Sequence, residues 1–272
     1  MDGTGGVRTA ARRPRPRRLR QPRVAEMLAD VLRDRILSGE LADGALLPKQ
    51  DDLLAEYRTS KASAREAFRI LETEGLISVQ RGNVGGAVVH RPKPEGAAYM
   101  LGLVLQSRGV PLSDVGAALQ YLEPLCAALC AERADRETEV VPRLMGAHLK
   151  LVRAIEDDDE VAAVAASRAF HEEIVRCSGN QTMILIAGAL ESLWSAHEAS
   201  WSVTAARSGR FPEPLLRKRA VQEHQHLIDA ITDGDIDRAA RTARKHLATA
   251  QQFPLADDSS ASVRAEYLRD LV

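Results

Sequence analysis

Apolar side chains recur every three or four residues along most of the chain, which is the pattern of helices that bury one face. The first such helix is predicted at 24–37, where Ser38-Gly39 ends it, and a second, shorter one at about 49–57. Ser60 is a good N-cap for a third helix at about 61–74, which Gly75 ends. The apolar face of the first helix carries Val24, Leu28, Val31, Leu32 and Ile36.

Two short segments of β type follow the third helix. Residues 76–80 and 87–90 are rich in β-branched side chains, and they flank a glycine-rich tip at 81–86 (RGNVGG). Extended segments on either side of a glycine-rich turn predict a β-hairpin. Three helices and a hairpin within 24–90 therefore predict an N-terminal winged helix-turn-helix domain.

The remainder of the chain carries helical signals only. A linker rich in proline and charge is predicted at 91–96, and residues 256–272 are expected to be a weakly ordered tail, apart from a short helix near 263–271. Helical patterns between them cover 97–108, 112–134, 138–157, 160–178, 181–203, 214–232 and 235–252. The fold is thus predicted to be mainly α, with an all-α helical bundle over 97–255.

The third helix has one apolar and one basic face. Its apolar positions, which should face the domain core, are Ala64, Ala67, Phe68 and Leu71. The opposite face presents Lys61, Arg65 and Arg69 at a spacing of four, with Ser60 and Ser63 at its N-terminal end. Basic residues on an exposed helix are often plain solvated surface. In a helix-turn-helix, however, they indicate the recognition helix, whose N-terminal turn contacts bases and phosphates.

The formal net charge of −1 conceals a basic N-terminal arm. Residues 1–23 contain eight arginines and one acid, interleaved with prolines, and are expected to be disordered. A cationic arm beside a DNA-binding domain adds attraction to phosphate without sequence readout. A solubilising segment or a misassigned start would have the same composition.

Several absences predict a cytoplasmic protein that does not enter a membrane. No run approaches the roughly 18 apolar residues of a membrane span, and the basic arm lacks the apolar core of a secretory signal. Three cysteines without framework spacing, Cys126, Cys130 and Cys177, fit a reducing compartment. Cys126 and Cys130 lie one helical turn apart, and buried core positions are favoured for them over a metal or redox pair.

The N-terminal domain resembles the GntR family of bacterial regulators. The resemblance is carried by residues 41–48 (LADGALLP), 52–55 (DLLA) and 60–76 (SKASAREAFRILETEGL), and by the glycines of the hairpin tip. It implies that operator DNA is contacted by Ser60, Lys61, Ser63 and Arg65, with Arg69 farther along the helix and Arg81 and Gly82 in the wing. Asp51 departs from the family, which often has a phosphate-binding arginine there.

The helical part resembles the FadR-like subfamily with an FCD-type domain. The matching residues are 122–124 (LEP), 170–171 (FH), 178–180 (SGN), 223–224 (EH), 227–231 (LIDAI), 234–235 (GD), 239–240 (AA) and 246–247 (HL). The resemblance implies a divalent metal, Zn²⁺, Ni²⁺ or similar, held here by His171, His224 and His246. Each lies in a separate predicted helix, and three imidazoles suit such an ion. By spacing alone they would more often be ordinary core or surface residues.

Two departures fall in the expected effector pocket. Ser167 stands where the subfamily has its acidic metal ligand, one turn before His171, and Leu119 stands where an arginine often binds an acidic effector. Together these changes favour a less acidic effector. We assign Ser167, Leu119 and His197 to the pocket, since His197 lies between Trp194 and Trp201 on one predicted helix.

These patterns favour a homodimeric, DNA-binding transcriptional regulator, a repressor more often than an activator, whose binding to a pseudo-palindromic operator responds to a small-molecule effector. No residue set suggests a base or nucleophile, so an enzyme is not expected. Two alternatives stay open: a metal-dependent hydrolase or lyase built on the three histidines, and a DNA-binding protein whose helical domain is only structural.

Overall fold

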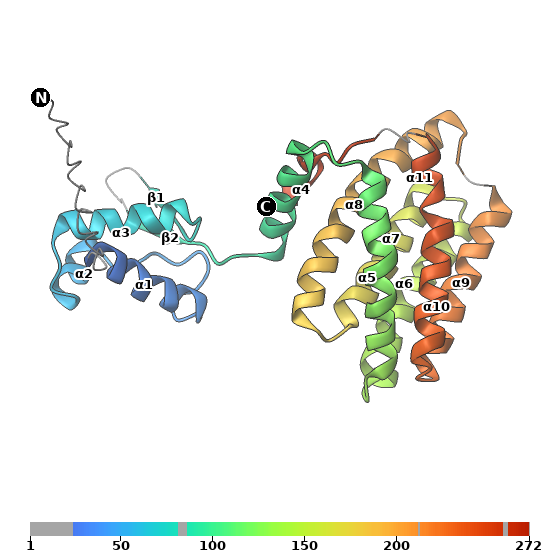
Figure 1. The fold of residues 1–272 in the computed structure, drawn as a ribbon, viewed down its shortest axis with the longest axis horizontal. Coiled ribbons are helices and arrows are strands. Elements are labelled where there is room, and N and C mark those ends of the chain that lie inside the picture. The colour runs from blue at the N-terminus through green and yellow to red at the C-terminus, as the bar shows by residue number, and fades with distance from the viewer. Residues whose placement is uncertain (1–23, 81–85, 212, 258–260, 272) are drawn as a thin grey trace, which may run out of the picture. The chain divides into compact units, whose positions relative to one another are not determined.

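The computed structural model describes residues 24–80, 86–211, 213–257 and 261–271. The chain divides into one compact unit that ends at Pro92 and a second that begins at Lys93 (Figure 1). The first contains three helices and a two-stranded hairpin, and the second is helical throughout. The predicted fold class is therefore confirmed. None of the described helices is long and apolar enough to cross a bilayer.

The first unit is built from short elements that cover one core. Its helices are α1 (Val24–Leu37), α2 (Gln50–Glu56) and α3 (Lys61–Thr73), and its strands are β1 (Ile77–Gln80) and β2 (Gly86–Val89). The turn between α2 and α3 places Arg58 in the left-handed region, with φ of 47°. Gly75, with φ of 74°, ends α3 and turns the chain into β1.

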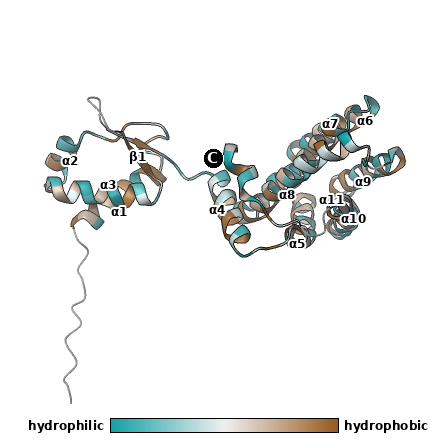
Figure 2. Ribbon diagram, turned by 90° about the horizontal axis from the view of Figure 1, so that it is seen from above, coloured by the Kyte–Doolittle hydropathy of each residue, from teal (hydrophilic) through white to brown (hydrophobic). Residues whose placement is uncertain are grey.

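The hairpin is antiparallel, and Ile77 pairs with Val89. The segment before α2 adds a further extended piece to it, because Leu47 N–H donates to the Ala87 carbonyl at 2.8 Å and Val89 N–H donates to the Ala45 carbonyl at 2.8 Å. In Figure 2 the hairpin strands are largely hydrophobic. The hairpin therefore closes one side of the core instead of projecting freely over its whole length.

The core of the first unit lies between α1, α3 and the hairpin. Leu32, Ile36, Leu53 and Leu71 are fully buried there. Ala64 and Ala67 of α3 are also fully buried, as the apolar spacing predicted, and Phe68 packs against the same core while partly exposed. Burial of this face fixes the opposite face of α3 toward solvent.

The second unit contains long helices joined by short turns. They are α4 (Pro94–Ser107), α5 (Leu112–Glu132), α6 (Val141–Glu156), α7 (Glu160–Cys177), α8 (Gln181–Ser208), α9 (Pro214–Thr232), α10 (Ile236–Ala250) and α11 (Gln252–Asp257), with a π-helical turn η1 (Arg136–Val140) before α6 and a 3-10 helix η2 (Ala265–Leu271) at the end. Helix α4 begins inside the stretch 91–96 that we read as a linker, because proline is well tolerated in the first turn of a helix.

Helix α5 occupies the middle of the second unit and packs against α7, α8, α9 and α10 (Figure 1). Around it, Phe170, Ile174, Leu144 and Leu227 form a continuous apolar cluster with almost no exposed area. Polar residues cover the outer faces, so the helices of this unit alternate between hydrophobic and hydrophilic colours along their lengths (Figure 2). This packing brings side chains from distant parts of the sequence into one interior.

The stretch after α11, expected from its composition to be weakly ordered, is packed where the structure describes it. Val263, Ala265 and Leu268 are buried, and Val263 N–H donates to the Val110 carbonyl at 3.0 Å. Ala265 lies against Gly102 of α4, where any larger residue would collide. The short helix expected near 263–271 is present as η2, but three apolar side chains on a short segment carry too little periodicity to predict that it is packed.

Candidate metal centre and DNA-binding surface

The outward face of α3 is basic and polar. Lys61, Arg65 and Arg69 are all exposed, at successive turns of the helix. Ser60 caps the N-terminus by accepting a hydrogen bond from Ser63 N–H at 3.1 Å. Free N–H groups and the positive end of the helix dipole at this terminus favour phosphate. Arg81 and Gly82 of the expected wing lie outside the described residues.

The three basic side chains of α3 differ in their neighbours. Lys61 Nζ lies 3.8 Å from Asp51 Oδ1 of α2, and Arg69 lies 3.5 Å from Glu66. Arg65 makes no ion pair with any residue the structure describes. Asp51, the departure noted above, thus partly neutralises Lys61, and Arg65 carries the least compensated charge on this face.

In the second unit, His171, His224 and His246 meet in the interior. They come from α7, α9 and α10, and all three are buried. His224 Nε2 lies 3.0 Å from His246 Nε2, which in turn lies 3.3 Å from His171 Nε2. Two nitrogens that bind one tetrahedral Zn²⁺ at about 2.0–2.1 Å lie about 3.3 Å apart. Three nitrogens converging at this spacing fit a single divalent ion.

Carboxyl groups, that of Glu123 buried and that of Glu223 partly exposed, lie at the Nδ1 atoms of two of these rings. His171 Nδ1 lies 2.6 Å from Glu123 Oε1 of α5, and His246 Nδ1 lies 2.9 Å from Glu223 Oε2 of α9. A carboxylate that accepts the Nδ1 proton leaves the lone pair at Nε2, which is the atom that faces the other histidines. For His171 and His246 this pairing favours the tautomer that a metal requires.

His224 is held by stacking. Its ring lies parallel to Phe170, with centroids 4.0 Å apart, and its Nδ1 is buried without a hydrogen-bond partner. His148 of α6 lies next to it, with ring centroids 6.4 Å apart, and also has a buried, unpartnered Nδ1. The third ligand position is thus shaped by packing, without the carboxyl partner of the other two.

Burial sets the protonation of the cluster. It lowers the pKa of His171, His224 and His246, and repulsion from the other two histidines lowers that of His224 further. It also raises the pKa of Glu123 to about 8 and that of Glu191 well above its usual range. Neutral imidazoles are the form that binds a metal.

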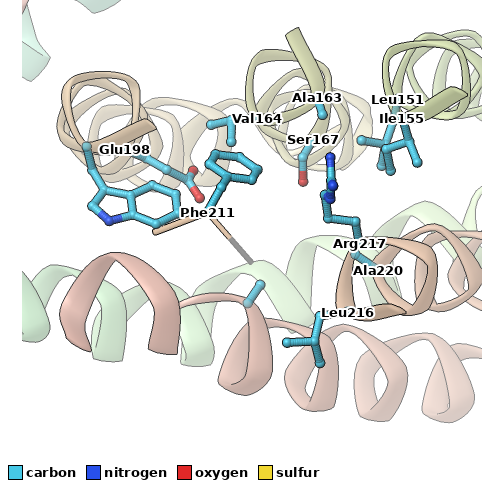
Figure 3. Close-up of a pocket in the computed structure, with 12 residues that line it drawn as sticks. Leu151, Ile155, Ala163, Val164, Ser167, Glu198, Phe211, Leu216, Arg217 and Ala220 are labelled. Atoms are coloured by element: carbon cyan, nitrogen blue, oxygen red, sulfur yellow. The ribbon is translucent and has the colours of Figure 1, made fainter. Parts of the chain in front are cut away.

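Two cavities that share part of their walls lie in this region, and one of them reaches the cluster at His171. The histidine cavity is the smaller, about 20 Å³, and His171 and Glu191 line it. The side cavity, between α6, α7, α8 and α9, has about 100 Å³, and its apolar wall includes Leu151, Ile155, Ala163, Val164, Phe211 and Leu216 (Figure 3). Ser167, Glu198 and Ala250 line both.

The three residues assigned to the effector pocket are placed differently from one another. Ser167 lines both cavities. Leu119 is fully buried in the apolar contact of α5 with α8 and lines neither of them. His197 accepts a hydrogen bond from Arg264 N–H at 3.0 Å and lines a separate cavity near the C-terminal stretch. Of the three, Ser167 alone adjoins the histidine cluster.

The cysteines belong to the interior. Cys126, Cys130 and Cys177 are buried and unpaired, and burial raises the pKa of the Cys126 thiol to about 12. A thiol with a raised pKa is a poor nucleophile and a poor metal ligand.

Comparison with known proteins identifies both units. The pattern of the FCD domain matches residues 114–249, and that of the bacterial regulatory proteins of the gntR family matches residues 24–88. The chain belongs to the GntR family of bacterial regulators. It is a DNA-binding transcriptional regulator with an effector-binding FCD domain, and the alternative of a metal-dependent enzyme is wrong.

Relatives of this GntR-family chain match along most of its length. It is 26% identical over 239 residues to the HTH-type transcriptional repressor NanR of Klebsiella aerogenes, covering 86% of each chain. It is also 26% identical over 245 residues to NanR of Escherichia coli, covering 86% of this chain and 85% of that protein. The solved structure of Streptococcus agalactiae GntR shares the fold, with a TM-score of 0.61 and 22% identity over 84% of this chain and 99% of that one.

Sequence reasoning missed the carboxyl groups around the GntR-family histidines. Glu223 precedes His224 in sequence but bonds to His246 on another helix, so its place in the sequence does not reveal its partner. Glu123 lies in the LEP motif at 122–124, but no role beside the histidines was assigned to it from the sequence. Glu191 and Glu198 gave no signal, because two acids on a long helix normally face solvent.

We expect metal binding to persist when the pH falls from 7.5 to 6.5 and to fail only at lower pH. An unperturbed histidine is half protonated near pH 6.5, whereas the lowered pKa values of these three keep them neutral there, so protons compete only below that pH. The measurement is the rise in melting temperature at a fixed free Zn²⁺ concentration at pH 7.5, 6.5 and 5.5. A rise at pH 6.5 of less than half that at pH 7.5 would contradict it.

Proposed function

We propose that this protein is a cytoplasmic, homodimeric repressor that binds a short pseudo-palindromic operator through the exposed face of α3. An effector that binds beside a divalent metal on His171, His224 and His246 changes its affinity for that operator. The observation that carries the metal and effector part is the convergence of three buried histidine nitrogens from three helices next to two cavities.

The direction of control follows from the relatives. Both NanR proteins are named transcriptional repressors, and they match this chain over both units. When bound, the metal would offer open positions to an oxygen of the effector. The protein supplies the histidines that would hold the ion and the carboxyls of Glu123 and Glu223 that orient them.

Exposed apolar side chains support the homodimer. Helices α5 and α8 pack against each other, and each exposes a pair of apolar residues: Tyr121 and Leu125 on α5, and Leu185 and Ile186 on α8. Large apolar side chains of this kind are candidates for burial between subunits. Two-fold symmetry of the dimer predicts two related half-sites in the operator.

The test is selection of bound sequences from random duplex DNA, followed by titration of the selected operator. We expect a pseudo-palindrome and specific binding at physiological salt. Enrichment of no sequence, together with weak binding that moderate salt abolishes, would overturn the proposal. If the operator stays bound whatever metal and metabolite are added, the effector part fails and the helical domain is structural.

A further inference from the structure

The side cavity combines an apolar wall with two ionic side chains of opposite sign. Glu198 of α8 and Arg217 of α9 both line it, and no ion pair joins them to each other. Figure 3 shows Glu198 toward one side and Arg217 toward the other, with Phe211 and Ser167 between them in this view. Opposite charges that line one cavity without meeting leave room for a molecule that contacts both.

Arg217 is held in place at the cavity by two neighbours. Its Nη1 donates to Asp158 Oδ1 at 3.0 Å, and its guanidinium lies 5.9 Å from the centre of the Phe211 ring. The side chain is only 12% exposed, and its Nε is buried without a partner. The guanidinium is therefore fixed and still has N–H groups to offer to an acceptor. A carboxylate suits this geometry best.

Glu198 lacks a matching cation. It makes no ion pair with any described side chain, although Arg168 and His171 are near enough to favour its charged form. Burial outweighs them and raises the pKa of Glu198. A carboxylate with little exposure is stabilised by a cation in direct contact, and no described side chain makes an ion pair with Glu198. A ligand ammonium group would fill that role.

Ser167 makes this end of the cavity suitable for an ammonium group as well. A hydroxyl accepts a hydrogen bond and carries no charge that would repel the carboxylate of a ligand. The volume of about 100 Å³ is smaller than the roughly 150 Å³ of an apolar cavity that holds benzene. The apolar wall therefore suits a short aliphatic group, with room for no more than a few carbon atoms.

We propose that the side cavity binds a small zwitterion, an α-amino acid with a short aliphatic side chain. Its ammonium group pairs with Glu198 and Ser167, its carboxylate with Arg217, and its side chain lies on the apolar wall formed by residues such as Leu151, Ile155 and Val164. The side cavity shares a wall with the cavity that His171 lines, and it is one of the two cavities on which the proposed effector site rests. The inference therefore rests on the proposed function and names the class of effector, and this ligand needs no metal of its own.

The test uses calorimetry on the full-length, chelator-treated protein. It compares the affinity for one amino acid with the affinities for two analogues, each of which lacks one of its charged groups. The probes are L-alanine, propanoate, which lacks the amino group, and ethylamine, which lacks the carboxylate. We expect L-alanine to bind at least about ten-fold more tightly than either analogue, because each analogue loses one charge-assisted hydrogen-bonded pair. Equal binding of L-alanine and either analogue by the wild-type protein overturns the proposal, as does no binding of L-alanine or glycine.

Substitutions of the two ionic residues test which charged group of the ligand each of them contacts. In Glu198→Gln the advantage of L-alanine over propanoate should vanish, and in Arg217→Gln its advantage over ethylamine should vanish. Ala220→Leu, which fills the cavity from α9, should abolish binding, whereas Gln222→Leu, at an exposed position of the same helix, should leave it unchanged. An undiminished advantage in the two charge variants overturns the assignment. Operator binding and Zn²⁺-dependent melting, measured in parallel, report on the proposed function separately.

Discussion

Replacing His224 by alanine should abolish the stabilisation of the protein by Zn²⁺ or Ni²⁺. In the wild-type protein, free metal at 100 times its dissociation constant should add about 2.7 kcal/mol to the free energy of unfolding. Each kcal/mol raises the melting temperature of a domain of this size by about 2–4 °C. Without His224 two ligand nitrogens remain, of which His246 Nε2 loses its nearest neighbour at 3.0 Å. We expect no resolvable rise in melting temperature at the same metal concentration.

A second buried histidine provides the control for this experiment. His197 is also buried, but its ring bonds to the Leu193 carbonyl and to Arg264 N–H, away from the cluster. His197→Gln should lower the stability of the metal-free protein and keep the full rise with metal. His224→Ala also opens a space beside Phe170, so each variant is compared with its own metal-free form. A rise in His224→Ala equal to that of the wild type would show that the ion binds elsewhere.

The helices were predicted from local sequence patterns. The errors in their boundaries arose where the local pattern is weak. The ends of helices with a continuous apolar stripe were predicted to within a few residues, because every turn of such a helix carries an apolar residue on its buried face. Helix α8 runs on to Ser208, past the predicted end at 203, because its last turns are made of small and polar residues and only Ala205 is buried among them. The π-helical turn Arg136–Val140 has no local signature that separates it from the helix that follows.

The candidate site was predictable only as far as individual ligands. Resemblance to the subfamily selected three of seven histidines, but their distances depend on how α7, α9 and α10 pack. The partners of those histidines come from α5 and α9, and the side cavity is lined by five helices, with its two ionic residues on different ones. Contacts of this kind are set by tertiary packing, which a single sequence does not encode in any local pattern.

The wall shared by the two cavities gives a physical reason for Ser167 at a position where the subfamily has a carboxylate. In isolation it removes one expected metal ligand. In the structure the same residue lies in the wall shared by the two cavities, beside Glu198. A third acid at this wall would add repulsion to a region where burial already raises the pKa values of Glu191 and Glu198. Serine adds no further charge to the shared wall.

Replacing Arg65 by alanine should weaken binding to the selected operator by about 1–3 kcal/mol for each half-site, which is roughly 5- to 150-fold. The reason is its place on α3: one turn into the helix, exposed, and unpaired with any described acid. A side chain there can reach a base edge, and the charge it brings is not already neutralised. The measurement is a binding isotherm on the operator and on scrambled duplex at the same salt concentration.

Arg69 provides the comparison, because it lies one turn farther along the same face and pairs with Glu66 at 3.5 Å. Arg69→Ala should weaken operator and scrambled duplex by similar, smaller factors, as loss of a phosphate contact does. Both side chains are exposed, so neither variant should change the free energy of unfolding by more than about 0.5 kcal/mol. If Arg65→Ala discriminates between the two duplexes as well as the wild-type protein does, then α3 enters the groove in another register and Arg65 does not read a base.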